Sequence, residues 1–260
     1  MFPKIIHYCW FGRNPLPELA LKCIESWKKF LPDYEIKEWN EDNYNVHKIP
    51  YISEAYDAKK YAFVSDYARF DILYQYGGIY FDTDVEVIKD LSPIIEQGAF
   101  AGVECAGALA AGLGIASPAA MPIYKEIIAS YENSTFVRSN GSYNLTTVVD
   151  RVSDIFKKNG FSKTENIQKI ADVIIYPAEY FCPIDPKTGI LNVTSNTYTI
   201  HHYAATWTIP LRKKYMNLRN KIASKIGIKL AKFVLFPLQC ICIIREVGFK
   251  SFLSKLNKLF

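Results

Sequence analysis

The alternation of apolar and polar residues predicts strands and helices that follow one another along most of the chain. Residues 4–10 form a β-rich run, and residues 17–30 show a helical pattern whose apolar positions share one face. Residues 34–39 then alternate as a half-buried strand. A strand, a helix and a strand in succession indicate a βαβ unit, so we expect a parallel sheet with right-handed crossovers and an α/β fold.

The same periodicities continue to about Pro210. Further helices are expected at residues 51–58, 60–76, 121–132 and 145–158, and further strands at residues 173–176 and 198–203. Residues 99–116 form a run rich in Gly and Ala. Such a run suits either a close approach of the backbone to a ligand or tight packing within a sheet.

The segment Gly77–Val87 combines two glycines, a short apolar strand and an Asp-x-Asp pair. Asp82 and Asp84 directly follow the strand, which places their carboxylates at the edge of a sheet. Divalent cations such as Mg²⁺ prefer carboxylate oxygen and are often shared with substrate phosphates, so the pattern predicts a metal–diphosphate site. A solvated turn between two strands is the alternative, because Asp is common in turns.

The character of the chain changes after Pro210. From Arg212 onward there are 12 basic residues and one acid, Glu246, which gives +11, whereas the preceding residues carry 19 basic and 25 acidic groups, a net of −6. Residues 212–232 are expected to form a basic helix, and residues 249–260 are again basic and amphipathic. Residues 233–244 are apolar but too few to span a bilayer. This pattern predicts a membrane-surface anchor; a helical arm packed on the core or on a second subunit is the alternative.

Cysteine usage and the N-terminus indicate a reducing compartment. The six cysteines show no CxxC pair and no zinc-ligand spacing, so we expect buried free thiols. The first residues lack the pattern of a signal peptide. Together with the basic tail, these features lead us to expect a cytoplasmic protein that is peripheral at the inner face of the cell membrane.

The helix before the Asp-x-Asp strand contains a second candidate pair. Asp66 and Arg69 are three residues apart and therefore share one face. They could form an ordinary surface ion pair, but their neighbours in sequence are mostly apolar. An acid and a guanidinium held together can instead recognise sugar hydroxyls and phosphate.

Four motifs in order resemble the DXD-containing glycosyltransferases of family 32, which include yeast mannosyltransferases and bacterial capsular transferases and are related to the clostridial glucosylating toxins. The motifs are Ile5–Gly12, Ser65-Asp66-x-x-Arg69, Gly77–Asp84 and His201–Trp207. The resemblance covers Phe2 to about Pro210. It implies a GT-A catalytic domain over residues 1–210 with a basic helical appendage at residues 211–260. It also implies a nucleotide-sugar donor, expected to be a UDP-sugar, with Mn²⁺ or Mg²⁺ and retention of anomeric configuration.

Carried over by position, the resemblance assigns roles in the first half of the site. Trp10 would stack on the donor base, with a core tryptophan as the alternative. Asp66 and Arg69 would contact the donor sugar and its phosphate side. Tyr80 would touch the nucleotide or sugar, or would be a core tyrosine. Among the metal-site residues, Asp84 would bind the metal directly, and Asp82 would bind ribose or a metal-bound water.

The last motif should complete the site from the far end of the domain. His201 is the first candidate for a further metal ligand and His202 the second, because adjacent strand residues face opposite ways. The resemblance implies that Thr206 and Trp207 hold the β-phosphate of the leaving nucleotide. Glu104, near the Gly/Ala-rich run, is a candidate acid on the acceptor side.

The expected function is transfer of a sugar to a glycan acceptor, most naturally a lipid-linked one in bacterial capsule, exopolysaccharide or O-antigen synthesis. Two alternatives remain: a protein acceptor, and a non-catalytic protein that binds nucleic acid through the basic tail. The tail alternates Lys with Leu, Ile and Phe, which favours a membrane surface and leads us to expect no nucleic-acid partner.

Overall fold

The computed structural model describes all residues except 1, 105–106, 164, 186–187, 205–209 and 248–260. The chain divides into two compact units. The first comprises Met1–Pro183 and Val193–Tyr203, and the second comprises Ile184–Asn192 and Ala204–Phe260. The second unit thus includes a short segment, Ile184–Asn192, that precedes the last stretch of the first unit in sequence.

The first unit is built on a seven-stranded sheet with the order β2-β1-β3-β6-β5-β8-β7. Its strands are β1 (Ile5–Cys9), β2 (Glu35–Trp39), β3 (Gly78–Tyr80), β5 (Phe100–Gly102), β6 (Ile115–Ser117), β7 (Gln168–Ile170) and β8 (Val173–Tyr176). The α/β class predicted from the sequence is confirmed. The prediction of a parallel sheet was wrong for half of the pairs: β1–β2, β1–β3 and β5–β8 are parallel, but β3–β6, β5–β6 and β7–β8 are antiparallel.

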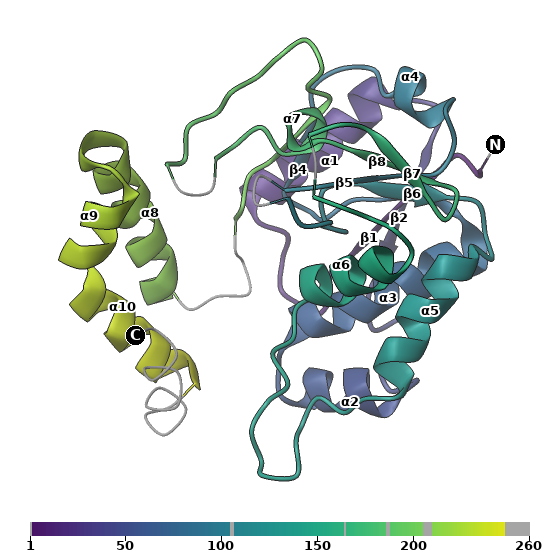
Figure 1. The fold of residues 1–260 in the computed structure, drawn as a ribbon. Coiled ribbons are helices and arrows are strands. Elements are labelled where there is room, and N and C mark those ends of the chain that lie inside the picture. Colours follow the sequence, from purple (N-terminus) through teal and green to yellow (C-terminus); the bar gives the residue numbers. More distant parts are fainter. Residues whose placement is uncertain (1, 105–106, 164, 186–187, 205–209, 248–260) are drawn as a thin grey trace. The chain divides into compact units, whose positions relative to one another are not determined.

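Helices cover both faces of this sheet (Figure 1). They are α1 (Glu18–Phe30), α2 (Pro50–Asp57), α3 (Tyr61–Tyr76), α4 (Ser92–Ile95), α5 (Pro122–Glu132), α6 (Val148–Lys158) and α7 (Ala178–Phe181). Successive strand residues alternate between two cores because strand side chains point to opposite faces. Ile79 packs with α1, whereas Tyr80 packs with α2, α3, α5 and α6.

The junction between α3 and β3 fixes the approach to the Asp-x-Asp segment. Gly77 and Gly78 have φ of 67° and 105°, a region that favours glycine. The Nε2 of His7 lies 2.9 Å from the Gly77 carbonyl oxygen, to which it donates, while Trp39 Nε1 donates to His7 Nδ1 at 3.1 Å. Burial lowers the pKa of His7 to about 4, so the ring is neutral and keeps this pair of bonds.

A separate two-stranded sheet connects distant parts of the first unit. β4 (Val85–Val87) pairs antiparallel with β9 (Thr199–His201), and Val85 lies opposite His201. The Trp27 indole of α1 donates to the Val85 carbonyl oxygen at 2.7 Å and ties β4 to the core. This pairing brings the His-His motif beside the Asp-x-Asp motif.

The described part of the second unit contains three helices, α8 (Pro210–Ile226), α9 (Ile228–Val234) and α10 (Phe236–Val247). They enclose a small core of Tyr215, Leu235 and Cys242. The single basic helix expected at residues 212–232 is instead interrupted at Gly227, whose φ of 82° ends α8. Among the described residues, no helix has the length and apolar character needed to cross a membrane. The expected amphipathic segment 249–260 lies outside the described residues.

Candidate active site

Asp82 and Asp84 lie in the turn between β3 and β4. The Asp82 N–H donates to the Gly112 carbonyl oxygen at 3.1 Å, and the Val85 N–H donates to the Asp82 carbonyl oxygen at 3.1 Å. The side chains of Asp82 and Asp84 are 31% and 16% exposed. The backbone is therefore fixed on both sides while the carboxylates remain within reach of a ligand.

His201 completes a cluster with the two aspartates. Its Nε2 is 3.2 Å from Asp84 Oδ1, and potential ligand atoms of Asp82, Asp84 and His201 all lie within 4.8 Å of one another. His202, the second candidate, turns away: its Nε2 lies 2.8 Å from Glu86 Oε2, and Glu86 also pairs with Lys22. Adjacent strand residues face opposite sides, so only His201 shares the face of the aspartates.

This donor set fits a divalent cation. Two carboxylates and an imidazole suit Mn²⁺, and the carboxylates also suit Mg²⁺. Burial alone would lower the pKa of His201, but the neighbouring Asp84 carboxylate raises it to about 10. His201 therefore holds a proton in this arrangement, and a divalent cation bound by its imidazole would displace that proton.

Arg69 links the Asp-x-Asp turn to α3. Its Nη2 donates to Asp66 Oδ1 at 2.9 Å, and its Nη1 lies 3.2 Å from Asp82 Oδ1. Only 3% of Arg69 is exposed, and its Nε donates to the Ser65 carbonyl oxygen at 3.1 Å. Asp66 and Arg69 thus form a buried bridge to Asp82, and the alternative of a solvated surface pair is excluded by their burial.

Asp66 titrates in an unusual range. Burial raises the pKa of its carboxyl to about 6, against the opposing charge of Arg69. The charge state of this bridge therefore changes close to neutral pH.

Tyr80 is a core residue that orients Asp82. Its ring is 1% exposed, and its hydroxyl donates to Asp82 Oδ1 at 3.0 Å. The Arg69 guanidinium carbon lies 4.9 Å from the centroid of the same ring. Of the two roles that the sequence left open, the geometry favours the core tyrosine with a polar contact to the site.

The Gly/Ala-rich run supplies the wall beside Asp82. A Cβ on Gly112 would collide with Asp82 Oδ2 and would lie 3.3 Å from Arg69 Nη1. A Cβ on Gly114 would lie 2.8 Å from the Phe81 ring. The run is thus tightly packed against Asp82 at Gly112 and against Phe81 at Gly114, and close approach to a ligand stays a prediction. Sequence reasoning had not singled out either glycine.

The remaining candidate residues are Trp10, Glu104, Thr206 and Trp207. Trp10 is half-buried at the end of β1, where its Nε1 donates to the Asn14 carbonyl oxygen at 2.6 Å. Burial raises the pKa of Glu104, while the charge of His201 opposes this shift and that of Asp150 adds to it. Thr206 and Trp207 lie outside the described residues.

A contact beside His201 was also missed by sequence reasoning. The Tyr203 ring centroid is 4.4 Å from that of His201, and the Tyr203 hydroxyl lies 2.8 Å from Cys182 Sγ. Tyr203 has a φ of 51°, a left-handed conformation that no sequence pattern predicted.

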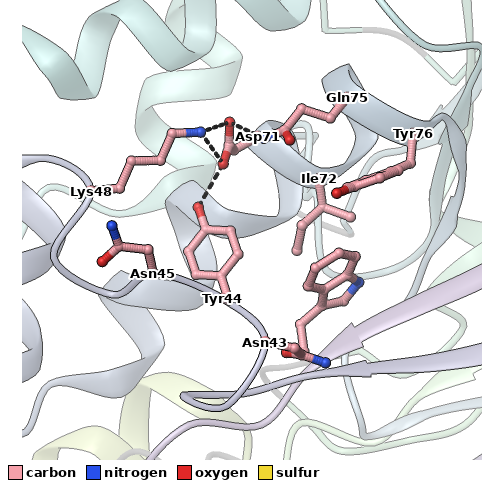
Figure 2. A pocket seen from close by; sticks show the side chains of 9 residues that line it. Asn43, Tyr44, Asn45, Lys48, Asp71, Ile72, Gln75 and Tyr76 are labelled. Atoms are coloured by element: carbon pink, nitrogen blue, oxygen red, sulfur yellow. Dashed lines mark hydrogen bonds and ion pairs between the residues drawn. The ribbon is translucent and has the colours of Figure 1, made fainter.

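A pocket between the loop after β2 and α3 shares no lining residue with the acidic cluster; Figure 2 shows its side chains. Its charged centre is Asp71, which is 4% exposed. Lys48 Nζ, the Tyr44 hydroxyl and Gln75 Nε2 all donate to its carboxylate, at 2.7, 2.9 and 2.8 Å. Because these donors occupy both carboxylate oxygens, the group holds the loop after β2 against α3.

Part of the chain is similar to a known glycosyltransferase family. Residues 17–101 match the family described as "Glycosyltransferase sugar-binding region containing DXD motif". The segment includes Asp66, Arg69, Tyr80, Asp82 and Asp84. The resemblance inferred from the sequence motifs is confirmed here.

Curated relatives match the chain over part of their length. Inositol phosphoceramide mannosyltransferase 3 of Schizosaccharomyces pombe is 34% identical over 102 residues, which make up 38% of this chain and 28% of that protein. Mannosyl phosphorylinositol ceramide synthase CSH1 of Saccharomyces cerevisiae is 30% identical over 104 residues, 38% of this chain and 27% of that protein. The matched region thus spans less than a third of the length of each of these two relatives.

Among solved structures, the chain resembles "PaToxG Glycosyltransferase" with a TM-score of 0.48 and 20% identity. The likeness covers 60% of this chain and 69% of that one.

Proposed function

We propose that the protein is a metal-dependent glycosyltransferase that moves a sugar from a nucleotide-sugar donor to a glycan acceptor. The observation that carries the proposal is the convergence of Asp82, Asp84 and His201 beside the buried Arg69–Asp66 pair. A cation-binding group and a fixed guanidinium at one place match a reaction whose leaving group is a diphosphate.

The residues of the chain have distinct parts in such a reaction. A bound divalent cation would supply Lewis-acid stabilisation of the departing diphosphate. Asp84 and His201 would hold it, with Asp82 directly or through a water molecule. Asp66 accepts hydrogen bonds and would orient sugar hydroxyls, while Arg69 keeps Asp82 and Asp66 in a fixed relation. Because these groups are held before the donor binds, little reorganisation accompanies the reaction.

Burial strengthens the contacts that hold Asp82. Arg69 and Tyr80 have almost no exposed surface, so their contacts with Asp82 operate in a poorly solvated setting where charge interactions are strong. Glu104 is the acid that we assign to acceptor binding. Retention of configuration, by attack of the acceptor hydroxyl from the leaving-group face, needs no protein nucleophile and remains the proposed course.

The acceptor that we propose is a lipid-linked glycan at the inner face of the cell membrane. Two relatives are named for mannosyl transfer to inositol phosphoceramide or for synthesis of its mannosyl product, which supports a lipid-linked acceptor and a hexose donor. Both come from fungi, so the bacterial capsule or O-antigen pathway and the UDP-sugar donor stay predictions from the sequence.

The test is a panel of nucleotide-sugars with Mn²⁺, scored for release of free nucleoside diphosphate. We expect turnover of one donor, loss of activity on chelation, and at least about a hundredfold loss in Asp84→Asn, because removal of a single electrostatic contact in a reaction centre typically costs that much. Asp33→Asn, at an aspartate whose side chain is 76% exposed, is the matched control. Full activity of Asp84→Asn, or turnover that survives chelation, would contradict the metal role.

A further inference from the structure

The second unit exposes one apolar face of α9. Leu230, Phe233 and Val234 are three and four residues apart, so they share a face of this helix. Their exposed fractions are 51%, 79% and 55%, whereas Ala231 and Leu235, on the other side, are 0% and 8% exposed. We call Leu230, Phe233 and Val234 the α9 face. These side chains protrude although the unit has a core of its own.

Lysines border the α9 face. Lys225, Lys229 and Lys232 are exposed within the same stretch of chain. The sequence contains no acidic residue between Tyr203 and Glu246. An apolar surface within an uninterrupted positive field needs a partner that offers both hydrocarbon and anions.

We propose that the α9 face inserts into the surface of an anionic lipid bilayer. Apolar side chains enter the boundary between head groups and acyl chains, and the lysines stay at the level of the head-group phosphates. The helix has only seven residues and does not need to span the membrane to do this. The proposal identifies a contact surface and does not depend on the proposed glycosyl transfer.

Two other occupants fit these residues less well. A nucleic acid would pair with the lysines but would leave Phe233 and Leu230 in water. A second copy of the chain, docked face to face, would bring the lysines of both copies together and oppose like charges. The bilayer satisfies the apolar and the charged groups at once.

The experiment is co-sedimentation of the full chain with phosphatidylcholine vesicles that contain phosphatidylglycerol. We expect binding that weakens in high salt and in pure phosphatidylcholine. Phe233→Ser should weaken it by about tenfold or more, because a buried apolar side chain is lost from the lipid boundary. Lys229→Gln should weaken it by about fivefold.

Leu21→Ser is the matched control, since Leu21 is 51% exposed on α1 in a segment that also contains acids. It should bind vesicles as the unaltered protein does. Unchanged binding of Phe233→Ser would overturn the proposal. So would a lower melting temperature or an altered oligomeric state of this variant without vesicles, because either result shows that protein covers the α9 face. Donor hydrolysis without vesicles should be unaffected, which separates this test from that of the proposed function.

Discussion

At the scale of single residues, Asp82 is held by three neighbours. Tyr80 and Arg69 contact its carboxylate, Gly112 accepts from its N–H, and the absence of a side chain at Gly112 leaves room for Oδ2. Such a carboxylate has few alternative positions, so it meets a cation or donor without losing conformational freedom.

Gly112→Ala is expected to displace this carboxylate. The added Cβ would collide with Asp82 Oδ2, while the backbone of Gly112 has no left-handed conformation that an alanine would strain. We expect kcat/KM for donor hydrolysis to fall by about a hundredfold, because displacements of about 1 Å at a reaction centre have effects of that size.

Gly98→Ala serves as the control for Gly112→Ala, because a Cβ there would meet no atom within 4 Å. Gly98→Ala should keep its activity. Because Gly98 has a φ of 113°, which disfavours alanine, this variant is expected to lose some thermal stability. Equal activity of Gly112→Ala and Gly98→Ala would show that Gly112 does not position Asp82.

The titration of Asp66 makes a second prediction at this scale. Its pKa of about 6 means that the carboxyl becomes neutral as the pH falls through that value. The ionised form pairs with Arg69, so kcat/KM should drop below about pH 6, and Asp66→Asn should lower activity and abolish this acidic limb. A pH–rate profile of both proteins checks this, and an unchanged limb in Asp66→Asn would assign it to another group.

Stability should change with pH in the opposite direction. The folded-state pKa of Asp66 lies above the ordinary value of 3.8, so the folded protein binds this proton more tightly than the unfolded chain. The contribution of Asp66 to the free energy of unfolding is therefore greatest below pH 3.8 and is lost as the pH rises through about 6.

At the scale of elements, local periodicity predicted most helices and strands but not their pairing. The expected strand at residues 173–176 matches β8, and the helix expected at residues 60–76 matches α3 to within one residue. The antiparallel pairs of β6 with β3 and β5 were missed. β6 lies in the Gly/Ala-rich run, where small apolar residues carry no alternation that distinguishes a strand from a loop.

Local sequence patterns also could not decide whether His201 or His202 faces the aspartates. The sequence placed His201 and His202 on opposite faces of one strand, but only the register of β9 against β4 determines which face meets the aspartates. Val85 opposite His201 directs that imidazole to Asp84 and leaves His202 to Glu86. Pairing between segments more than a hundred residues apart depends on the tertiary fold, which short-range patterns do not encode.

At the scale of the whole molecule, the two units have separate cores. The two cores of the first unit contain no described residue beyond Tyr203, and the second unit has its own core around Tyr215. The charges are divided in a similar way, with −6 before Arg212 and +11 from Arg212 onward. The acidic part carries the candidate active site, and the basic part carries the α9 face.

Deletion of residues 212–260 should therefore separate the two activities. The shortened chain keeps the acidic cluster, both cores of the first unit and the segment 204–211, so we expect donor hydrolysis with kcat/KM close to that of the full chain. It lacks the α9 face and all 12 basic residues of the tail, so binding to anionic vesicles should be lost. Calorimetry should still detect the unfolding transition of the first unit, because its buried apolar groups are unchanged.

Full-length Phe233→Ser is the matched control for this deletion, with hydrolysis intact and vesicle binding weakened. A shortened chain that unfolds at a much lower temperature, or that hydrolyses no donor while Phe233→Ser does, would show that the first unit depends on the tail for its fold.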